Sequence, residues 1–300
     1  VSISASDLDL LQGRQWDAVI DTCGYLPRAV KASTEALAGA IDHYMLISSM
    51  SAYADLSVAG VDETAPLERL TAAQLQTANE IDTSGQVSAM TYGELYGGLK
   101  ALCEQAVEDA MPGRSIILRP GLIVGARDYS ERFTYWVVRV ARGGEVLAPG
   151  KPQRYLQLID VRDLAAWAIT CVEARTAGVF NVSGRPGQLT MTSLLEQCRA
   201  VSHSDARLIW VSDDFLLQKQ IAPWSEIPLW IPEDMFELKG FMLLDCSKAL
   251  TAGLRPRPVS QTIQDVLSWS KTHSPQENLK AGLDFDQERD LLDEWHKIHK

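Results

Sequence analysis

The chain has 300 residues, 46% of which are hydrophobic, and a formal net charge of −11 at pH 7. This length and apolar content suffice for one large α/β domain, or for one domain with a smaller lobe. The acidic balance argues against nucleic acid as a partner, since phosphate binding needs surplus Lys and Arg, and the absence of any run of 18 apolar residues argues against a membrane partner.

Short apolar runs alternate with helical patterns over the first 120 residues. A short apolar run that ends in a loop predicts a buried strand, and apolar residues at helical spacing predict a helix. Residues 54–90 lack a strong period and are interpreted as a long, partly helical insertion. In chain order, the pattern predicts strands at 16–21, 43–48 and 114–119 and helices at 27–40 and 91–110.

This alternation predicts a parallel sheet with helices on both faces. In such sheets, ligands bind beyond the carboxyl ends of the strands. Polar and glycine residues collect at three of these ends: Asp21–Gly24, Ser48–Ser51 and Arg119–Gly125. We therefore expect an α/β fold, a Rossmann-type doubly wound sheet with a smaller C-terminal α/β lobe.

The second half has a different character. A helix is predicted at 133–142, a strand at 156–161, a helix at 162–174 and a strand at 178–182, followed by a segment rich in Trp and Pro. We expect a larger domain at 1–127 to which 156–183 contribute. We expect a smaller lobe at 128–155 and 184–275, and a C-terminal segment at 276–300 whose helix, from Phe285 to Lys300, is a surface element.

The sharpest local signal is Tyr96-Gly-Gly-Leu-Lys100. Positions i and i+4 share one helix face, so the phenol of Tyr96 and the ammonium of Lys100 lie side by side. A neighbouring ammonium lowers the pKa of a phenol and lets it exchange protons nearer neutral pH. The alternative is a buried Tyr beside a solvated Lys. Gly97 and Gly98 each cost about 1 kcal/mol in a helix relative to Ala, which favours close approach by a ligand over plain helix packing.

Two further motifs stand at strand ends. The serines at positions 48, 49 and 51 can hydrogen-bond a substrate oxygen, although serines after a strand are commonly turn residues. The segment Arg119-Pro-Gly-Leu-Ile-Val-Gly125 offers backbone that could face a flat ring. Five segments together carry a resemblance to a known family: Leu46–Tyr53, Tyr96 with Lys100, Leu118–Gly125, Leu158–Ala165 and Phe180–Val182.

In this order the motifs resemble the extended (atypical) short-chain dehydrogenase/reductase family, the NAD-dependent epimerases and dehydratases, over roughly residues 11–270. The resemblance implies an NAD(P)-dependent oxidoreductase with NAD or NADP as cofactor. It also implies that 1–127 with 156–183 form a partial dinucleotide-binding Rossmann domain, and that 128–155 and 184–275 form a substrate-binding lobe. Tyr96 would be the acid/base and Lys100 would tune it and hold the nicotinamide ribose. Ser49 would be the catalytic hydroxyl, with Ser48 as the second choice and a cofactor contact. The other implied cofactor contacts are Thr22, Cys23, Gly24, Pro120, Gly121 and Ile123.

The sequence departs from this family in two places. The glycine-rich turn that holds the pyrophosphate is absent from these 300 residues, so we expect an N-terminal segment to be missing and cofactor binding to be poor. Where nucleotide-sugar members carry a diphosphate-binding Arg, this chain has Leu156. Arg154, two residues earlier and on the same strand face, is the expected substitute.

The net reaction stays open between epimerisation, dehydration and simple reduction at a secondary alcohol or ketone carbon, of a sugar or nucleotide sugar among others. A non-catalytic cofactor sensor or scaffold is the alternative.

Scattered cysteines without a CxxC pair favour free thiols and a cytoplasmic location, and they argue against a metal site. A small-molecule substrate is the expected partner, and a homodimer is compatible with the prediction. Four arginines are compatible with an anion-binding face of one helix and equally with a solvated face that forms salt bridges: Arg127, Arg132, Arg139 and Arg142.

Overall fold

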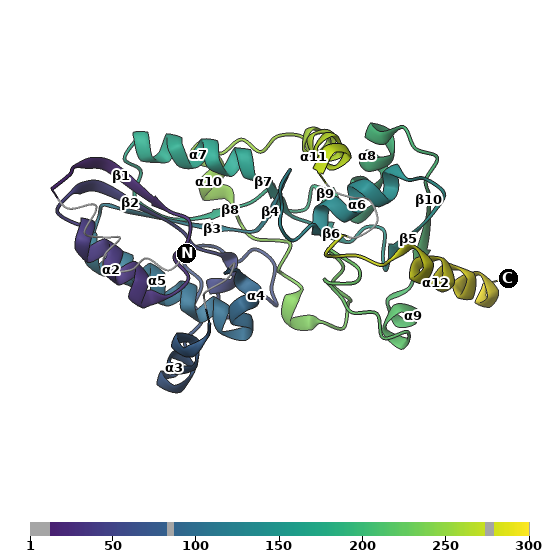
Figure 1. Ribbon diagram of the computed structural model, residues 1–300, viewed down its shortest axis with the longest axis horizontal. Helices are drawn as coiled ribbons and strands as arrows, with labels where there is room; N and C mark the ends of the chain where they lie inside the picture. Colours follow the sequence, from purple (N-terminus) through teal and green to yellow (C-terminus); the bar gives the residue numbers. More distant parts are fainter. Residues whose placement is uncertain (1–12, 83–86, 274–278, 300) are drawn as a thin grey trace. The chain divides into compact units, whose positions relative to one another are not determined.

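The computed structural model describes residues 13–82, 87–273 and 279–299 (Figure 1). The chain divides into two compact units. The first comprises the residues up to Gly121, Leu164–Ser183 and Leu244–Leu254, and the second comprises Leu122–Asp163, Gly184–Leu243 and the residues from Arg255. Two segments expected in the first domain, residues 122–127 and 156–163, lie in the second unit. Residues 244–254, expected in the second domain, lie in the first unit.

The first unit is built on a four-stranded parallel sheet in the order β1-β2-β3-β8. Apolar runs form these strands because both faces of a parallel sheet are covered. The strands are β1 (Trp16–Asp21), β2 (Ile41–Ile47), β3 (Ser115–Pro120) and β8 (Gly178–Val182). The predicted α/β fold class with a parallel sheet is confirmed.

Helices cover both faces of this sheet (Figure 1). On one face lie α2 (Pro27–Leu37) and α5 (Tyr96–Ala110), and on the other lie α10 (Ser247–Thr251) and α7 (Val161–Glu173), the latter in the first unit from Leu164. Apolar side chains of α2 and α5 pack on β2 and β3. Each fully buried Leu or Val contributes roughly 1.5–3 kcal/mol.

The predicted insertion is partly helical, with α3 (Ala72–Glu80), α4 (Ala89–Tyr92) and the short 3-10 helices η1 (Met50–Ala52) and η2 (Gly93–Leu95). Residues 83–86 lie outside the described ranges. A capping box between Thr71 and Gln74 begins α3. The helix predicted from residue 91 begins instead at Tyr96, because Gly93 has a φ of 52° and interrupts it.

The second unit contains three two-stranded sheets and a helical core. β4 (Leu122–Val124) pairs with β7 (Leu158–Asp160), and β5 (Glu145–Pro149) pairs with β10 (Arg207–Val211), both in parallel. The antiparallel pair is β6 (Tyr155–Leu156) with β9 (Leu189–Thr190). The predicted strand at 156–161 is thus two strands. The helices are α6 (Arg132–Ala141), α8 (Met191–Ser202), α9 (Asp213–Gln218), η3 (Phe236–Leu238), α11 (Val259–His273) and α12 (Phe285–Ile298).

The terminal helix α12 is part of this unit and not a mere surface element. Leu291 and Leu292 are buried in the hydrophobic core. Glu288 is 2% exposed and forms an ion pair with the buried Arg139 of α6. Breaking such a buried pair costs about 3–5 kcal/mol because one charge stays buried and unpaired. The prediction of a peripheral helix was therefore wrong.

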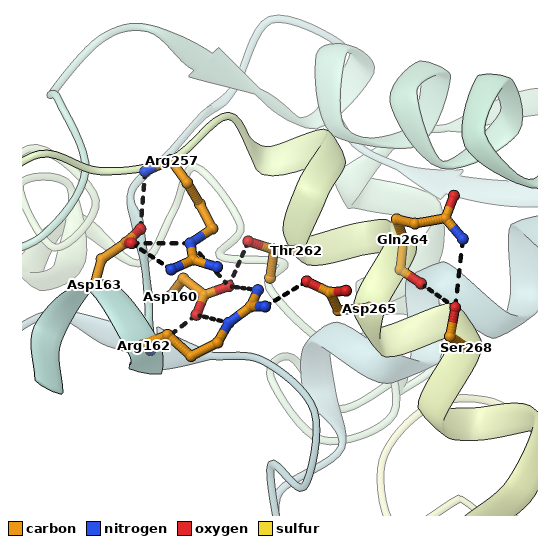
Figure 2. Close-up of polar contacts among 8 residues, drawn as sticks. All are labelled: Asp160, Arg162, Asp163, Arg257, Thr262, Gln264, Asp265 and Ser268. Carbon is orange, nitrogen blue, oxygen red and sulfur yellow. Dashed lines mark hydrogen bonds and ion pairs between the residues drawn. The ribbon is translucent and has the colours of Figure 1, made fainter. Parts of the chain in front are cut away.

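A polar network joins the end of β7 to the start of α11 (Figure 2). The carboxylate of Asp160 accepts hydrogen bonds from Arg162 Nε at 2.9 Å and from Thr262 Oγ1 at 2.7 Å. Arg257 donates from its backbone N and from Nε to Asp163, each at 2.8 Å. Burial opposes the ionisation of Asp160, but hydrogen bonds from Arg162 and Thr262 outweigh it and lower its pKa. The network thus fixes the start of α11 in the second unit.

Within the described ranges, no helix combines the length and the apolar content that a membrane crossing requires.

Candidate functional site

The predicted site residues of the first unit gather at one edge of its sheet. The register pairs Asp21 with Leu46, Ile47 with Leu118 and Pro120 with Val182, so the carboxyl ends of all four strands are level. Thr22–Gly24, Ser48 and Gly121 follow directly from those ends. This is the edge at which parallel sheets bind ligands.

Tyr96 and Lys100 lie on the same side of α5. Tyr96 is the first residue of the helix and is half-buried. Both side chains meet Tyr25, whose ring centroid is 6.2 Å from that of Tyr96 and 5.2 Å from Lys100 Nζ. Tyr25 lies in the loop after β1. Tyr96 and Lys100 thus both lie beside this strand-end loop.

Lys100 holds two strand ends together. Its side chain is 2% exposed, and Nζ donates to the carbonyl oxygens of Gly24 at 2.9 Å and Ile47 at 2.8 Å. Burial lowers the pKa of Lys100, although the charges of Cys103 and Asp21 oppose this shift. The solvated Lys of the alternative interpretation is therefore wrong. Gly24 has no room for a side chain, because a Cβ would lie 2.7 Å from Leu46 Cδ1.

The two glycines of the motif admit protein atoms. A Cβ on Gly97 would lie 2.1 Å from the carbonyl oxygen of Ser51, and one on Gly98 would lie 2.5 Å from Leu70 Cγ. Both contacts are with the chain itself, so packing accounts for these glycines and the preferred explanation, ligand approach, is not needed. Gly97 nevertheless matters for the site. It lets the loop at Ser48–Ser51, here called the serine loop, pack against the helix next to Tyr96.

The two candidate serines have different surroundings. Ser48 is 3% exposed and its hydroxyl donates to Glu104 of α5. Ser49 is half-buried, and its Oγ caps η1 by accepting from Ser51 N at 3.1 Å. The hydroxyl hydrogen of Ser49 is not used in that bond. Ser49 is thus better placed than Ser48 to donate to a substrate oxygen.

Glu104 is a residue that sequence reasoning missed. It lies at i+8 from Tyr96 and i+4 from Lys100, on the same face of α5, and is 2% exposed. Its carboxylate binds Arg119 through Nε at 3.0 Å and Nη2 at 2.6 Å, in addition to Ser48. Glu104 therefore ties the end of β2 to the end of β3. The spacing of Glu104 from the Tyr and Lys was the available signal.

A second buried contact extends this network toward β8. The hydroxyl of Tyr53 donates to Asn181 Oδ1 at 2.6 Å, and the Arg119 guanidinium lies 4.8 Å from its ring centroid. Burial raises the pKa of Tyr53 to about 12, against the effect of Arg119. Tyr53 is a structural tyrosine that closes the loop after β2.

The remaining predicted cofactor contacts of the first unit lie at the same edge. Thr22 and Cys23 are exposed. Pro120 ends β3. Gly121 donates from its backbone N to Val182 O at 3.0 Å, and a Cβ on it would lie 2.8 Å from Ser183 Oγ.

Two predicted residues belong to the second unit. Ile123 lies in the middle of β4. Arg154 lies just before β6, outside the strand on which we placed it, and its guanidinium is paired with Asp213 at 2.6 Å. Leu156, at the position compared with the family arginine, is fully buried.

The four arginines considered as an anion-binding face do not form one. Arg127 precedes α6, and Arg139 is buried against Glu288. Arg132 packs on the Trp224 ring and Arg142 on the Phe285 ring. Trp136 and Trp230 are fully buried, as expected for core packing. Among the described residues, no group of three His, Cys, Asp or Glu could hold a metal ion, and all five cysteines are free.

The sequence matches no family model and no curated protein. Solved structures with the same fold include UDP-glucuronic acid 4-epimerase from Bacillus cereus in complex with NAD (16% identity, TM-score 0.56, covering 88% of this chain and 77% of that one). They also include the UDP-Glc/GlcNAc 4-epimerase from Campylobacter jejuni (15%, 0.59, 88% and 80%) and UDP-glucose 4-epimerase from Thermotoga maritima (14%, 0.56, 88% and 80%). The chain therefore has the Rossmann-like fold of these epimerases.

Proposed function

We propose that this protein is an NAD(P)-dependent enzyme of the extended short-chain dehydrogenase/reductase kind. It interconverts a secondary alcohol and a ketone, within an epimerisation, a dehydration or a reduction. One observation carries the proposal: Tyr96 and Lys100 share a helix face at the carboxyl edge of a parallel sheet, against the loop that carries Ser49. The solved structures of two similar epimerases, one with NAD and one with UDP-glucose, support the fold that this proposal requires.

The proposed roles follow from the chemistry of each group. Tyr96 exchanges the proton of the substrate hydroxyl, Ser49 donates a hydrogen bond to the same oxygen, and the ammonium of Lys100 favours the phenolate. A bound NAD(P) supplies the acceptor or donor of the hydride. In the direction of oxidation Tyr96, as the tyrosinate, takes the hydroxyl proton of the alcohol, and the hydride would pass to a bound NAD(P)⁺, so that charge and electrons balance.

Part of the cofactor fits the first unit. Two N–H groups of Lys100 bind Gly24 O and Ile47 O, which leaves the third, within the described residues, for a ribose hydroxyl. Gly121 exposes backbone without a side chain, and the buried Ser183 Oγ beside it has no hydrogen-bond partner there. The residues present therefore match the nicotinamide-ribose end.

The pyrophosphate end needs a glycine-rich turn that these 300 residues do not contain. In the described part of the chain β1 pairs with β2 on one side only, and its Ile20 is 42% exposed. We infer that a strand carrying the glycine-rich turn pairs with this free edge of β1. An uncovered apolar edge would otherwise favour aggregation.

The alternative is a non-catalytic sensor or scaffold that has kept the fold and lost turnover, and the missing turn favours this loss. The two functions are separated by oxidation of NADH or NADPH in the presence of a panel of ketones and keto-sugars. Turnover that Tyr96→Phe removes supports the enzyme, and cofactor binding with no turnover on any member supports the sensor.

A further inference from the structure

A cavity of about 680 Å³ in the second unit offers a binding site. Its size falls within the usual range of small-molecule sites, roughly 300–1,000 Å³. Leu229 and Met242 contribute apolar walls, and Arg154 and Asp213 stand among its polar groups.

The one arginine of the cavity is already bound to an internal anion. Arg154 Nη2 lies 2.6 Å from Asp213 Oδ2, and Nη1 lies 3.3 Å from Asp213 Oδ1. The two side chains are only 15% and 16% exposed. This two-point contact is the geometry with which an arginine binds a phosphate. An incoming phosphate would therefore have to displace Asp213.

Asp213 is itself held in place. Its carboxylate also accepts from Trp230 Nε1 at 2.8 Å and from the backbone N of Glu233 at 3.0 Å. Burial opposes the ionisation of Asp213, but the hydrogen bonds from Arg154 and Trp230 outweigh it and lower its pKa. The carboxylate stays charged at neutral pH and does not release the guanidinium.

The remaining charges of the cavity also disfavour an anion. Asp214, Glu233 and Asp234 line it beside Asp213, whereas Lys239 is the only basic lining residue besides Arg154. The ammonium of Lys239 lies 4.1 Å from the centroid of the Phe236 ring. Lys151 forms an ion pair with Glu233 at 2.8 Å and offsets one of these charges, so four acidic groups face three basic ones and the charge balance does not favour a diphosphate.

We infer that Asp213 sets the ligand class of this cavity. By holding Arg154 in an internal ion pair it excludes nucleoside diphosphates, and it leaves the cavity to a ligand group that carries no phosphate.

The test is calorimetric titration of the chain with uridine diphosphate and with uridine, which shares the base and the ribose but has no phosphate. In the wild-type protein UDP should bind no more tightly than uridine. Asp213→Asn should raise the affinity for UDP by about tenfold or more, because Arg154 gains a phosphate partner. Its affinity for uridine should stay unchanged.

Two further variants identify the cause of any gain. Asp214→Asn removes an equal charge from the same cavity without freeing Arg154 and should bring no gain. Adding Arg154→Gln to Asp213→Asn should abolish the gain. Equal gains from Asp213→Asn and Asp214→Asn, or no gain in a folded Asp213→Asn protein, would overturn the inference.

A third measurement does not depend on the folding of Asp213→Asn. Saturable UDP binding by the wild-type chain, lost in Arg154→Gln, would also overturn the inference. None of these titrations requires turnover. Their failure therefore leaves the proposed function intact, and a failure of the proposed chemistry leaves the ion pair intact.

Discussion

At the scale of single residues, the site depends on charges that are buried and satisfied. Lys100 and Glu104 are both 2% exposed, yet each binds two groups at strand ends. A buried charge with its partners removed costs several kcal/mol. The face of α5 that carries Tyr96 is therefore also the face that holds the sheet edge in shape.

Replacing Glu104 tests this coupling. Glu104→Gln leaves the Arg119 charge buried without its counter-ion, and we expect a loss of about 3–5 kcal/mol of stability in urea unfolding. Glu108→Gln, at an exposed glutamate one turn later on the same helix, is the matched control and should lie within about 0.5 kcal/mol of wild type. Equal effects of the two substitutions would contradict the role of the buried pair.

At the scale of elements, Gly97 lets the serine loop pack closely against α5 because it has no side chain. Gly97→Ala puts a Cβ against the carbonyl of Ser51, so either the loop or the helix must move. We expect a stability loss of about 1–3 kcal/mol and a fall in turnover. Gly39→Ala, where a Cβ meets nothing within 4 Å, should be neutral or slightly stabilising. A Gly97→Ala protein with wild-type stability would show that the loop has room.

The network around Asp160 predicts how the second unit responds to acid. Its folded pKa lies below the usual value of about 3.9. The stabilisation is therefore complete above that usual pKa and is lost as the pH falls through the folded pKa. Urea unfolding between pH 7 and pH 3 should show a steeper decline for wild type than for Asp160→Asn. Asp17→Asn, at an exposed carboxylate of β1, serves as the control, and parallel curves for wild type and Asp160→Asn would contradict the assignment.

Sequence patterns predicted the strands of the first unit well, because apolar runs such as 16–21 and 43–48 are buried on both faces. They predicted the helix α12 but not its burial, since its buried ion pair depends on Glu288, which looks like any exposed glutamate in a sequence. The pairing of Arg154 with Asp213 spans 59 positions and has no local signal. The local pattern of apolar residues therefore predicts strands and helices from the sequence, whereas the partners of buried charges are set by the tertiary fold.

At the scale of the whole molecule, the account predicts weak cofactor binding by these 300 residues. Stabilisation by a ligand grows as RT ln(1 + [L]/Kd), so a site that holds only the nicotinamide-ribose end should give a small shift in Tm. Thermal melting with and without NADH and NADPH checks this. A strong shift would show that the pyrophosphate is held without a glycine-rich turn, and would remove the reason for a further strand on β1.

The most direct test of the central claim is turnover by Tyr96→Phe in a chain that carries the glycine-rich segment, with Tyr92→Phe, at the last residue of the separate helix α4, as the control. The account predicts that Tyr96→Phe lowers kcat by about 10²-fold or more, the usual contribution of general acid–base catalysis, while the Kd for NADH stays unchanged. Tyr92→Phe should retain wild-type turnover. Wild-type kcat in Tyr96→Phe would contradict the account.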